Sequence, residues 1–143
     1  MQVLVDTTIW SLALRRSMAP ISETEKSITS DLRDLIEDGR ARIIGSIQQE
    51  LLSGIRDRAQ FEKLRTYLRA LPDERASTDD YEEAARWNNQ RRSRGIADSS
   101  ADFLICAIAI ACGWQIFPRD DDFLRYARVI PIKLYLSGGA TDR

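Results

Sequence analysis

The chain has 143 residues, of which 43% are hydrophobic and 30% are charged, and its formal net charge at pH 7 is −1. This length fits one domain with a core of its own, and the composition excludes a disordered chain. The longest apolar stretch is shorter than the ~18 residues of a membrane span, and no basic leader opens the chain, so we expect a cytoplasmic protein without membrane contact.

The amino-terminal part of the chain alternates an apolar run of strand length with helical patterns. VLV (3–5) predicts a buried strand, and TTIWSLALRR (7–16) follows it. Apolar residues at helical spacing predict a helix over 23–38, which Gly39 ends. This alternation predicts a strand followed by two helical segments.

The middle of the chain repeats this order. ARIIG (41–45) predicts the second strand, and Ser46 with Gln49 three residues later predicts a capping box at the start of the next helix. Apolar spacing predicts helices over 58–71 and 79–94, the second of them highly charged. The middle of the chain therefore adds one strand and three helices.

The carboxyl-terminal part carries the most apolar segment. Length, small alanines and the glycine that follows favour a buried helix over 101–112, capped by a serine at 99 or 100. WQIF (114–117) predicts a central strand, DDDFLRYARV (120–129) a short helix, and IKLYL (132–136) a last strand.

Strands that alternate with helices, joined by connections too long for hairpins, predict the fold class. We expect one α/β domain over residues 1–136, a three-layer α/β/α sandwich around a mainly parallel sheet. Residues 137–143 are expected to form a loose tail.

Acidic residues stand where the predicted strands end. Asp6 ends the first strand, Glu50 is placed in the first turn of the helix after the second, Asp102 opens the buried helix, and Asp120 follows WQIF, with Asp122 two residues later. Because the carboxyl ends of parallel strands form the usual ligand site of such sheets, these carboxylates are expected to converge there.

Each acid alone is also explained by helix capping or by the helix dipole. Together they would repel one another strongly, and a divalent cation removes that repulsion. Hard oxygen ligands, without histidine or paired thiolates, select Mg²⁺ or Mn²⁺ over zinc. Cys106 and Cys112 match no metal or redox spacing and are interpreted as reduced core cysteines.

The residue inventory excludes several mechanisms. The chain contains no histidine, which rules out a Ser-His-Asp triad, a Cys-His dyad and histidine-based ribonuclease chemistry. It contains no glycine-rich phosphate loop. Metal-assisted hydrolysis of a phosphodiester remains the best fit.

Three motifs in order, VLVDTTIW, SIQQELLSGI and GIADSSADFLICAIAIACGWQIFPRDDDF, resemble the PIN domain family and in particular its VapC-type toxins. The resemblance implies an Mg²⁺-dependent endoribonuclease with Asp6, Glu50, Asp102 and Asp120 as its acidic cluster. It implies that Asp122 is a further acidic position and that the hydroxyl of Thr7 or Thr8 holds a metal-bound water or a neighbouring carboxylate.

The resemblance also implies partners: an RNA substrate, a cognate antitoxin and a second copy of the chain. The alternatives are a housekeeping PIN nuclease in RNA processing and a non-catalytic α/β binding module in which the acids only cap helices. Pro118 departs from the family pattern, which affects substrate positioning, and Cys106 replaces a usual alanine in the core.

Arginines near the acids offer phosphate contacts or, equally, are solvated helix ends. They are Arg15, Arg16, Arg91, Arg92, Arg94 and Arg119.

Overall fold

The computed structural model describes residues 1–14, 22–96, 98–119 and 121–137. Its strands are β1 (Val3–Val5), β2 (Ala41–Ile44), β3 (Asp73–Glu74), β4 (Gln115–Phe117) and β5 (Lys133–Leu134). Its helices are α1 (Thr7–Leu14), α2 (Glu23–Glu37), α3 (Gly45–Leu52), α4 (Arg58–Arg69), α5 (Thr78–Arg92), α6 (Ser100–Cys112) and α7 (Asp122–Tyr126).

The strands form one sheet in the order β3-β2-β1-β4-β5, and each neighbouring pair is parallel. In the centre of the sheet, Leu4 of β1 lies opposite Arg42 on one side and Ile116 on the other. The predicted parallel α/β fold is therefore confirmed, and β1 and β4 occupy its interior.

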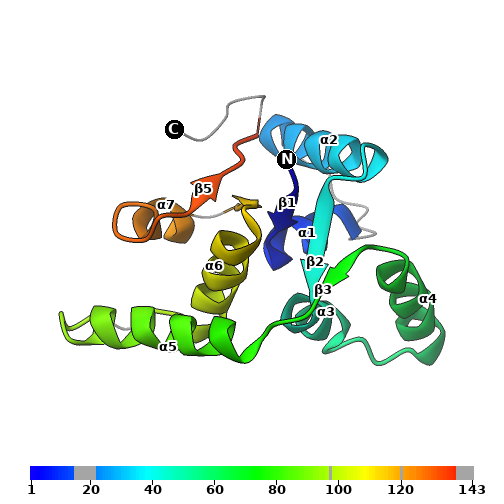
Figure 1. Ribbon diagram of the computed structural model, residues 1–143. Helices are drawn as coiled ribbons and strands as arrows, with labels where there is room; N and C mark the ends of the chain where they lie inside the picture. The colour runs from blue at the N-terminus through cyan, green and yellow to red at the C-terminus, as the bar shows by residue number, and fades with distance from the viewer. Residues whose placement is uncertain (15–21, 97, 120, 138–143) are drawn as a thin grey trace.

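The helices cover the two faces of this sheet. Parallel strands are joined by right-handed crossovers, so the connections from β1 to β2 and from β2 to β3 place α1 to α4 on one face. The chain then returns across the sheet to β4 and β5, which places α5 to α7 on the other face. Figure 1 shows α5, α6 and α7 on the left of the view and α2 and α4 on the right.

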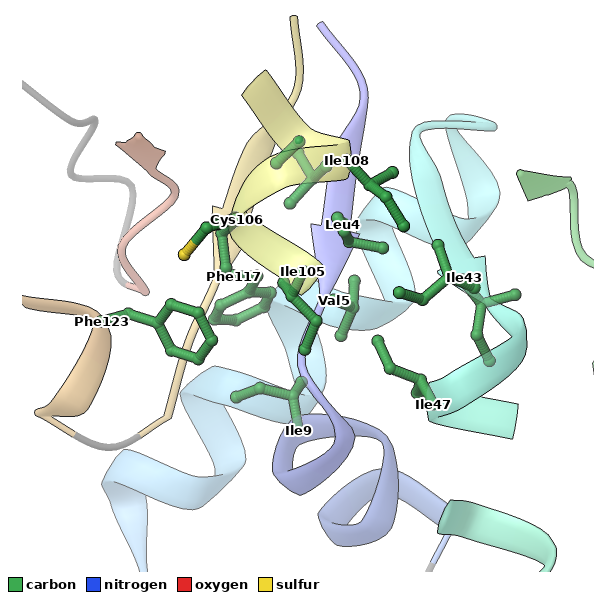
Figure 2. Packing of buried hydrophobic residues seen from close by; sticks show 14 of the residues in the cluster. Leu4, Val5, Ile9, Ile43, Ile47, Ile105, Cys106, Ile108, Phe117 and Phe123 are labelled. Carbon is green, nitrogen blue, oxygen red and sulfur yellow. The ribbon is translucent and has the colours of Figure 1, made fainter. Parts of the chain in front are cut away.

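The core fills the space between the sheet and the helices. Leu4 and Val5 of β1 have no exposed surface, and Ile105 and Ile108 of α6 are at most 2% exposed. Figure 2 shows these α6 side chains beside those of β1. Strands whose residues are all buried are typical of a parallel sheet covered on both faces.

The predicted buried helix is confirmed as α6. The Ser99 hydroxyl accepts a hydrogen bond from the backbone N–H of Asp102, which caps the helix, and Gly113 ends it with a φ of 72°. A left-handed residue at this position suits glycine because it has no Cβ. The capping serine is thus Ser99 and not Ser100.

In the middle of the chain one prediction was wrong and one strand was missed. The capping box of Ser46 and Gln49 does not form: Ile44 is the N-cap of α3, with no side-chain cap among the described residues. The helix begins directly at Gly45, where β2 ends, so Ser46 already lies inside it. The short strand β3 was not predicted, because it is only two residues long and depends on pairing with β2.

The end of the chain is described only as far as Ser137. The Ser137 hydroxyl donates to Oδ2 of Asp31 in α2 at 2.7 Å, and the rest of the predicted tail lies outside the described residues. No helix in the part of the chain that the structure describes is both long and apolar enough to cross a membrane.

Candidate functional site

The sheet has a topological switch point between β1 and β4. The chain leaves β1 toward β2 over one face, whereas β4 is reached over the opposite face, so the connections after these two neighbouring strands diverge. Divergence of this kind opens a crevice at the carboxyl ends of the strands. The backbone N–H of Asp6 donates to the carbonyl oxygen of Phe117 at 3.1 Å, which joins the ends of the two strands at this switch point.

Asp6 occupies the step from β1 to α1. Asp6 is buried, with only 6% of its surface exposed. Oδ1 accepts from the backbone N–H of Thr7 at 2.8 Å, and Oδ2 accepts from the Thr8 hydroxyl at 3.2 Å. These two bonds hold the carboxylate at the start of α1.

Asp102 lies in the first turn of α6, on the opposite face of the sheet from α1. Its Oδ2 accepts a hydrogen bond from the Tyr126 hydroxyl of α7 at 3.0 Å. Burial raises the pKa of the Tyr126 phenol, and the negative charge of Asp102 and the hydrogen bond to it raise this pKa further. The phenol is therefore protonated at neutral pH and acts as the donor.

The Cys106 thiol lies within electrostatic range of both Asp6 and Asp102. Cys106 follows Asp102 by one helical turn and is completely buried. Burial raises the pKa of the Cys106 thiol, and the negative charges of Asp102 and then of Asp6 raise it further. Two carboxylates nearly one hundred residues apart in the sequence thus act on the same group.

We expect Cys106 to resist alkylation in the folded protein. Its raised pKa leaves almost no thiolate at neutral pH, and the thiolate is the reactive form. Treatment with iodoacetamide at pH 7.5 followed by mass spectrometry should modify the partly exposed Cys112 and leave Cys106 unmodified.

A Cys112→Ser variant provides the control, since it leaves Cys106 as the only thiol of the chain. This variant should react only after addition of denaturant. Fast modification of the native variant would show that the thiol is neither buried nor protonated as described.

The structure places the other predicted acidic residues as follows. Glu50 is exposed in the second turn of α3, not in the first turn as predicted, because α3 begins at Gly45. The Asp122 carboxylate forms an ion pair with Arg125. Asp120 lies outside the described residues. Asp121, predicted to face solvent, is exposed.

The donor chemistry of this region fits a hard dication, because carboxylate oxygens suit Mg²⁺ or Mn²⁺ and the buried thiol is protonated. Within the described ranges, which leave out residue 120, no group of three or more His, Cys, Asp or Glu residues is able to hold a metal ion. The role of Asp6, Glu50, Asp102, Asp120 and Asp122 as metal ligands therefore stays a prediction.

Some of the candidate RNA-binding arginines are engaged in ion pairs. Nε of Arg91 lies 2.7 Å from Oδ2 of Asp98, with the two side chains 11% and 5% exposed. Arg119 pairs with Glu25 of α2 at 2.9 Å. The hydrogen bond from the Ser22 backbone N–H, and then that from Arg119, lower the pKa of the Glu25 carboxyl. Arg92 and Arg94 are exposed, and residues 15 and 16 lie outside the described residues.

A cleft of about 370 Å³ opens next to this region, at the carboxyl end of β2. Ser46 and Gln49 of α3, Arg75, Tyr81 of α5 and Leu104 of α6 line it. Asp6, Glu50 and Asp102 are not among its lining residues.

Two features of the region were not predicted from the sequence. The hydrogen bond from Tyr126 to Asp102 spans 24 residues, and the ion pair of Arg91 with Asp98 spans 7 residues across a loop. In neither pair are the two residues three or four positions apart, as neighbours on one helix face are. No periodic pattern in the sequence therefore predicts these contacts.

Comparison with known proteins agrees with this architecture. VapBC2 of Rickettsia felis bound to a promoter DNA fragment has a TM-score of 0.71 at 16% identity, over 96% of this chain and 99% of that chain. FitAcB of Neisseria gonorrhoeae has a TM-score of 0.69 at 16% identity, over 96% of this chain and 98% of that chain. VapC20 of Mycobacterium tuberculosis, a Sarcin-Ricin loop cleaving toxin, has a TM-score of 0.61 at 16% identity, over 90% of this chain and 96% of that chain.

No curated protein matches the sequence. The family model of the PIN domain matches residues 3–129. That match begins at β1, ends just after α7 and includes both Asp6 and Asp102. Because it spans most of the chain, and because the parallel sheet and its helices follow the same fold as the solved structures, the chain belongs to the PIN domain family.

Proposed function

We propose that this protein is a metal-dependent endoribonuclease that hydrolyses RNA phosphodiester bonds and acts as the toxin of a toxin-antitoxin pair. The observation that carries the proposal is the PIN domain match over residues 3–129, within which Asp6 follows β1 and Asp102 lies in the first turn of α6. The negative charges of both carboxylates also raise the pKa of the buried Cys106 thiol.

In this proposal, the chain's residues bind and orient a Mg²⁺ or Mn²⁺ ion. Asp6, held by Thr7 and Thr8, and Asp102, held by Tyr126, would be ligands, and Glu50 and Asp120 would complete the set. When bound, the cation would lower the pKa of a water molecule and offset charge on the leaving oxygen. Since the chain has no histidine, the proposal assigns proton transfer to carboxylates and water.

The toxin role is supported by the solved structures that share the fold. Besides VapC20, a Toxin-antitoxin complex from Klebsiella pneumoniae has a TM-score of 0.64 at 17% identity, over 85% of this chain and 88% of that chain. We therefore propose a cognate antitoxin as the protein partner. A homodimer is proposed with it, and light scattering after gel filtration would measure its mass.

Removal of the metal tests the catalytic part of the proposal. We expect the purified protein to cleave single-stranded RNA internally in Mg²⁺, to lose this activity in EDTA, and to regain it when Mg²⁺ or Mn²⁺ is added in excess. Gel electrophoresis of end-labelled RNA would measure the cleavage. Equal cleavage in EDTA and in Mg²⁺ would contradict the metal-dependent mechanism.

Two further measurements separate the alternatives. A housekeeping nuclease should not arrest growth when expressed, whereas a toxin should, and co-expression of the neighbouring gene's product should relieve the arrest.

A non-catalytic binding module should bind no metal at the carboxylates. Isothermal titration with Mn²⁺ would identify that case by the absence of a binding signal.

A further inference from the structure

The phenol of Tyr126 contacts Asp102 from outside the helix that bears it. The hydroxyl of Tyr126, in α7, lies 3.0 Å from Oδ2 of Asp102, in the first turn of α6. The residue is only 1% exposed, so water does not compete freely for this hydrogen bond. The α6 helix is already capped by Ser99, and the bond from Tyr126 is therefore additional to the local bonds of the helix start.

Packing fixes the ring of Tyr126 on several sides. The ring centroids of Phe103 and Phe123 lie 5.0 Å and 5.4 Å from that of Tyr126, the second in an edge-to-face arrangement. The guanidinium carbon of Arg125 lies 5.6 Å from the ring centroid. Contacts of this kind restrict the ring to one position, so the hydroxyl is held in place before any ligand binds.

Ion pairs fix α7 itself. Arg125 pairs with Asp122 in its own helix and lies 3.7 Å from Asp98, whose side chain is 5% exposed. Asp98 in turn pairs with Arg91 at the end of α5. These charges connect α7 to the segment that immediately precedes α6.

We propose that Tyr126 is a positioning residue for the Asp102 carboxylate and sets the affinity of the site for its divalent cation. This inference rests on the proposed function. Carboxylates that bind metals are oriented by hydrogen bonds from neighbouring groups, and loss of such a bond typically lowers metal affinity or activity by roughly 10- to 100-fold. Tyr126 supplies this bond through an oriented hydroxyl and does not touch the metal.

The variant Tyr126→Phe tests the proposal, because it removes the hydroxyl and keeps the ring. We expect its Kd for Mn²⁺, measured by isothermal titration, to be about 10-fold weaker than that of the wild type. Tyr135→Phe is the matched control, a partly buried tyrosine that packs edge-on against Phe117. It should bind Mn²⁺ as the wild type does.

The outcomes are distinguishable. If the wild type binds Mn²⁺ and Tyr126→Phe binds it equally well, the positioning role is wrong and the proposed nuclease site stands. If the wild type binds no Mn²⁺, the proposed function fails and this inference fails with it. In an Asp102→Asn background, Tyr126→Phe should have no further effect on Mn²⁺ affinity, since Tyr126 acts through the Asp102 carboxylate.

A spectroscopic measurement tests the proposal on the unsubstituted chain. The chain has 4 tyrosines, which can be replaced uniformly by 3-fluorotyrosine and assigned with single Tyr→Phe variants. On titration of the folded protein with Mg²⁺, the ¹⁹F resonance of Tyr126 should shift and that of the exposed Tyr81 should not. An unchanged Tyr126 resonance at saturating Mg²⁺ would overturn the proposal.

Discussion

Asp6→Asn is expected to lower kcat/KM for Mg²⁺-dependent RNA cleavage by about 1,000-fold or more. Asparagine keeps the size of the side chain and an acceptor for Thr7 or Thr8, but it removes the negative charge that binds the cation. A metal ion contributes several kcal/mol to transition-state stabilisation, and each ~1.4 kcal/mol is tenfold in rate. Initial rates on one fluorogenic RNA would measure the loss.

Asp121→Asn is the matched control, since Asp121 is an exposed aspartate close in sequence to the proposed acids and its side chain caps no helix among the described residues. It should cleave RNA at the wild-type rate. Circular dichroism of both variants would confirm that they fold. Wild-type cleavage by a folded Asp6→Asn would reject the proposed site, whatever the family of the chain.

Arg91→Met is expected to lower the free energy of unfolding by about 3 kcal/mol, which corresponds to a Tm lower by about 10 °C. The substitution leaves the Asp98 carboxylate buried without its nearest cation, and an uncompensated buried charge is costly. The effect is placed at the lower end of the usual range because Arg125 remains 3.7 Å from Asp98. Urea denaturation would measure it.

Arg86→Met provides the comparison on the same helix. Arg86 pairs with Glu83, and these side chains are 67% and 43% exposed, so loss of this pair should cost less than about 1 kcal/mol. The double variant Arg91→Met, Asp98→Leu should recover most of the stability lost in the single variant, because it removes both buried charges. Equal destabilisation by Arg86→Met and Arg91→Met would contradict the buried pair.

Local patterns in the sequence were sufficient for most of the secondary structure. The apolar runs of β1 and β4 and the periodic helices α2 and α4 were predicted because burial repeats along the chain with the period of the element. The prediction failed where an element depends on a neighbour. The pairing of β3 with β2 stabilises a strand of two residues that has no apolar pattern.

The start of α3 shows the same limit of local reasoning. Ser46 with Gln49 has the spacing of a capping box, yet the helix begins at Gly45, because β2 continues directly into it. This one-step difference moved Glu50 from the first turn to the second. A local capping preference of about 1 kcal/mol is small compared with the packing that fixes where a strand ends.

The sequence by itself determined the alternation of strands and helices, the parallel sheet, and the positions of Asp6 and Asp102 at the starts of helices, since these follow from periodicity and from the order of elements. Only the tertiary structure decided which charged and polar groups meet. Tyr126 reaches Asp102, and Arg91 is taken by Asp98 and removed from the surface. Such contacts depend on how whole helices and strands pack in three dimensions, and the spacing of residues along the chain does not predict that packing.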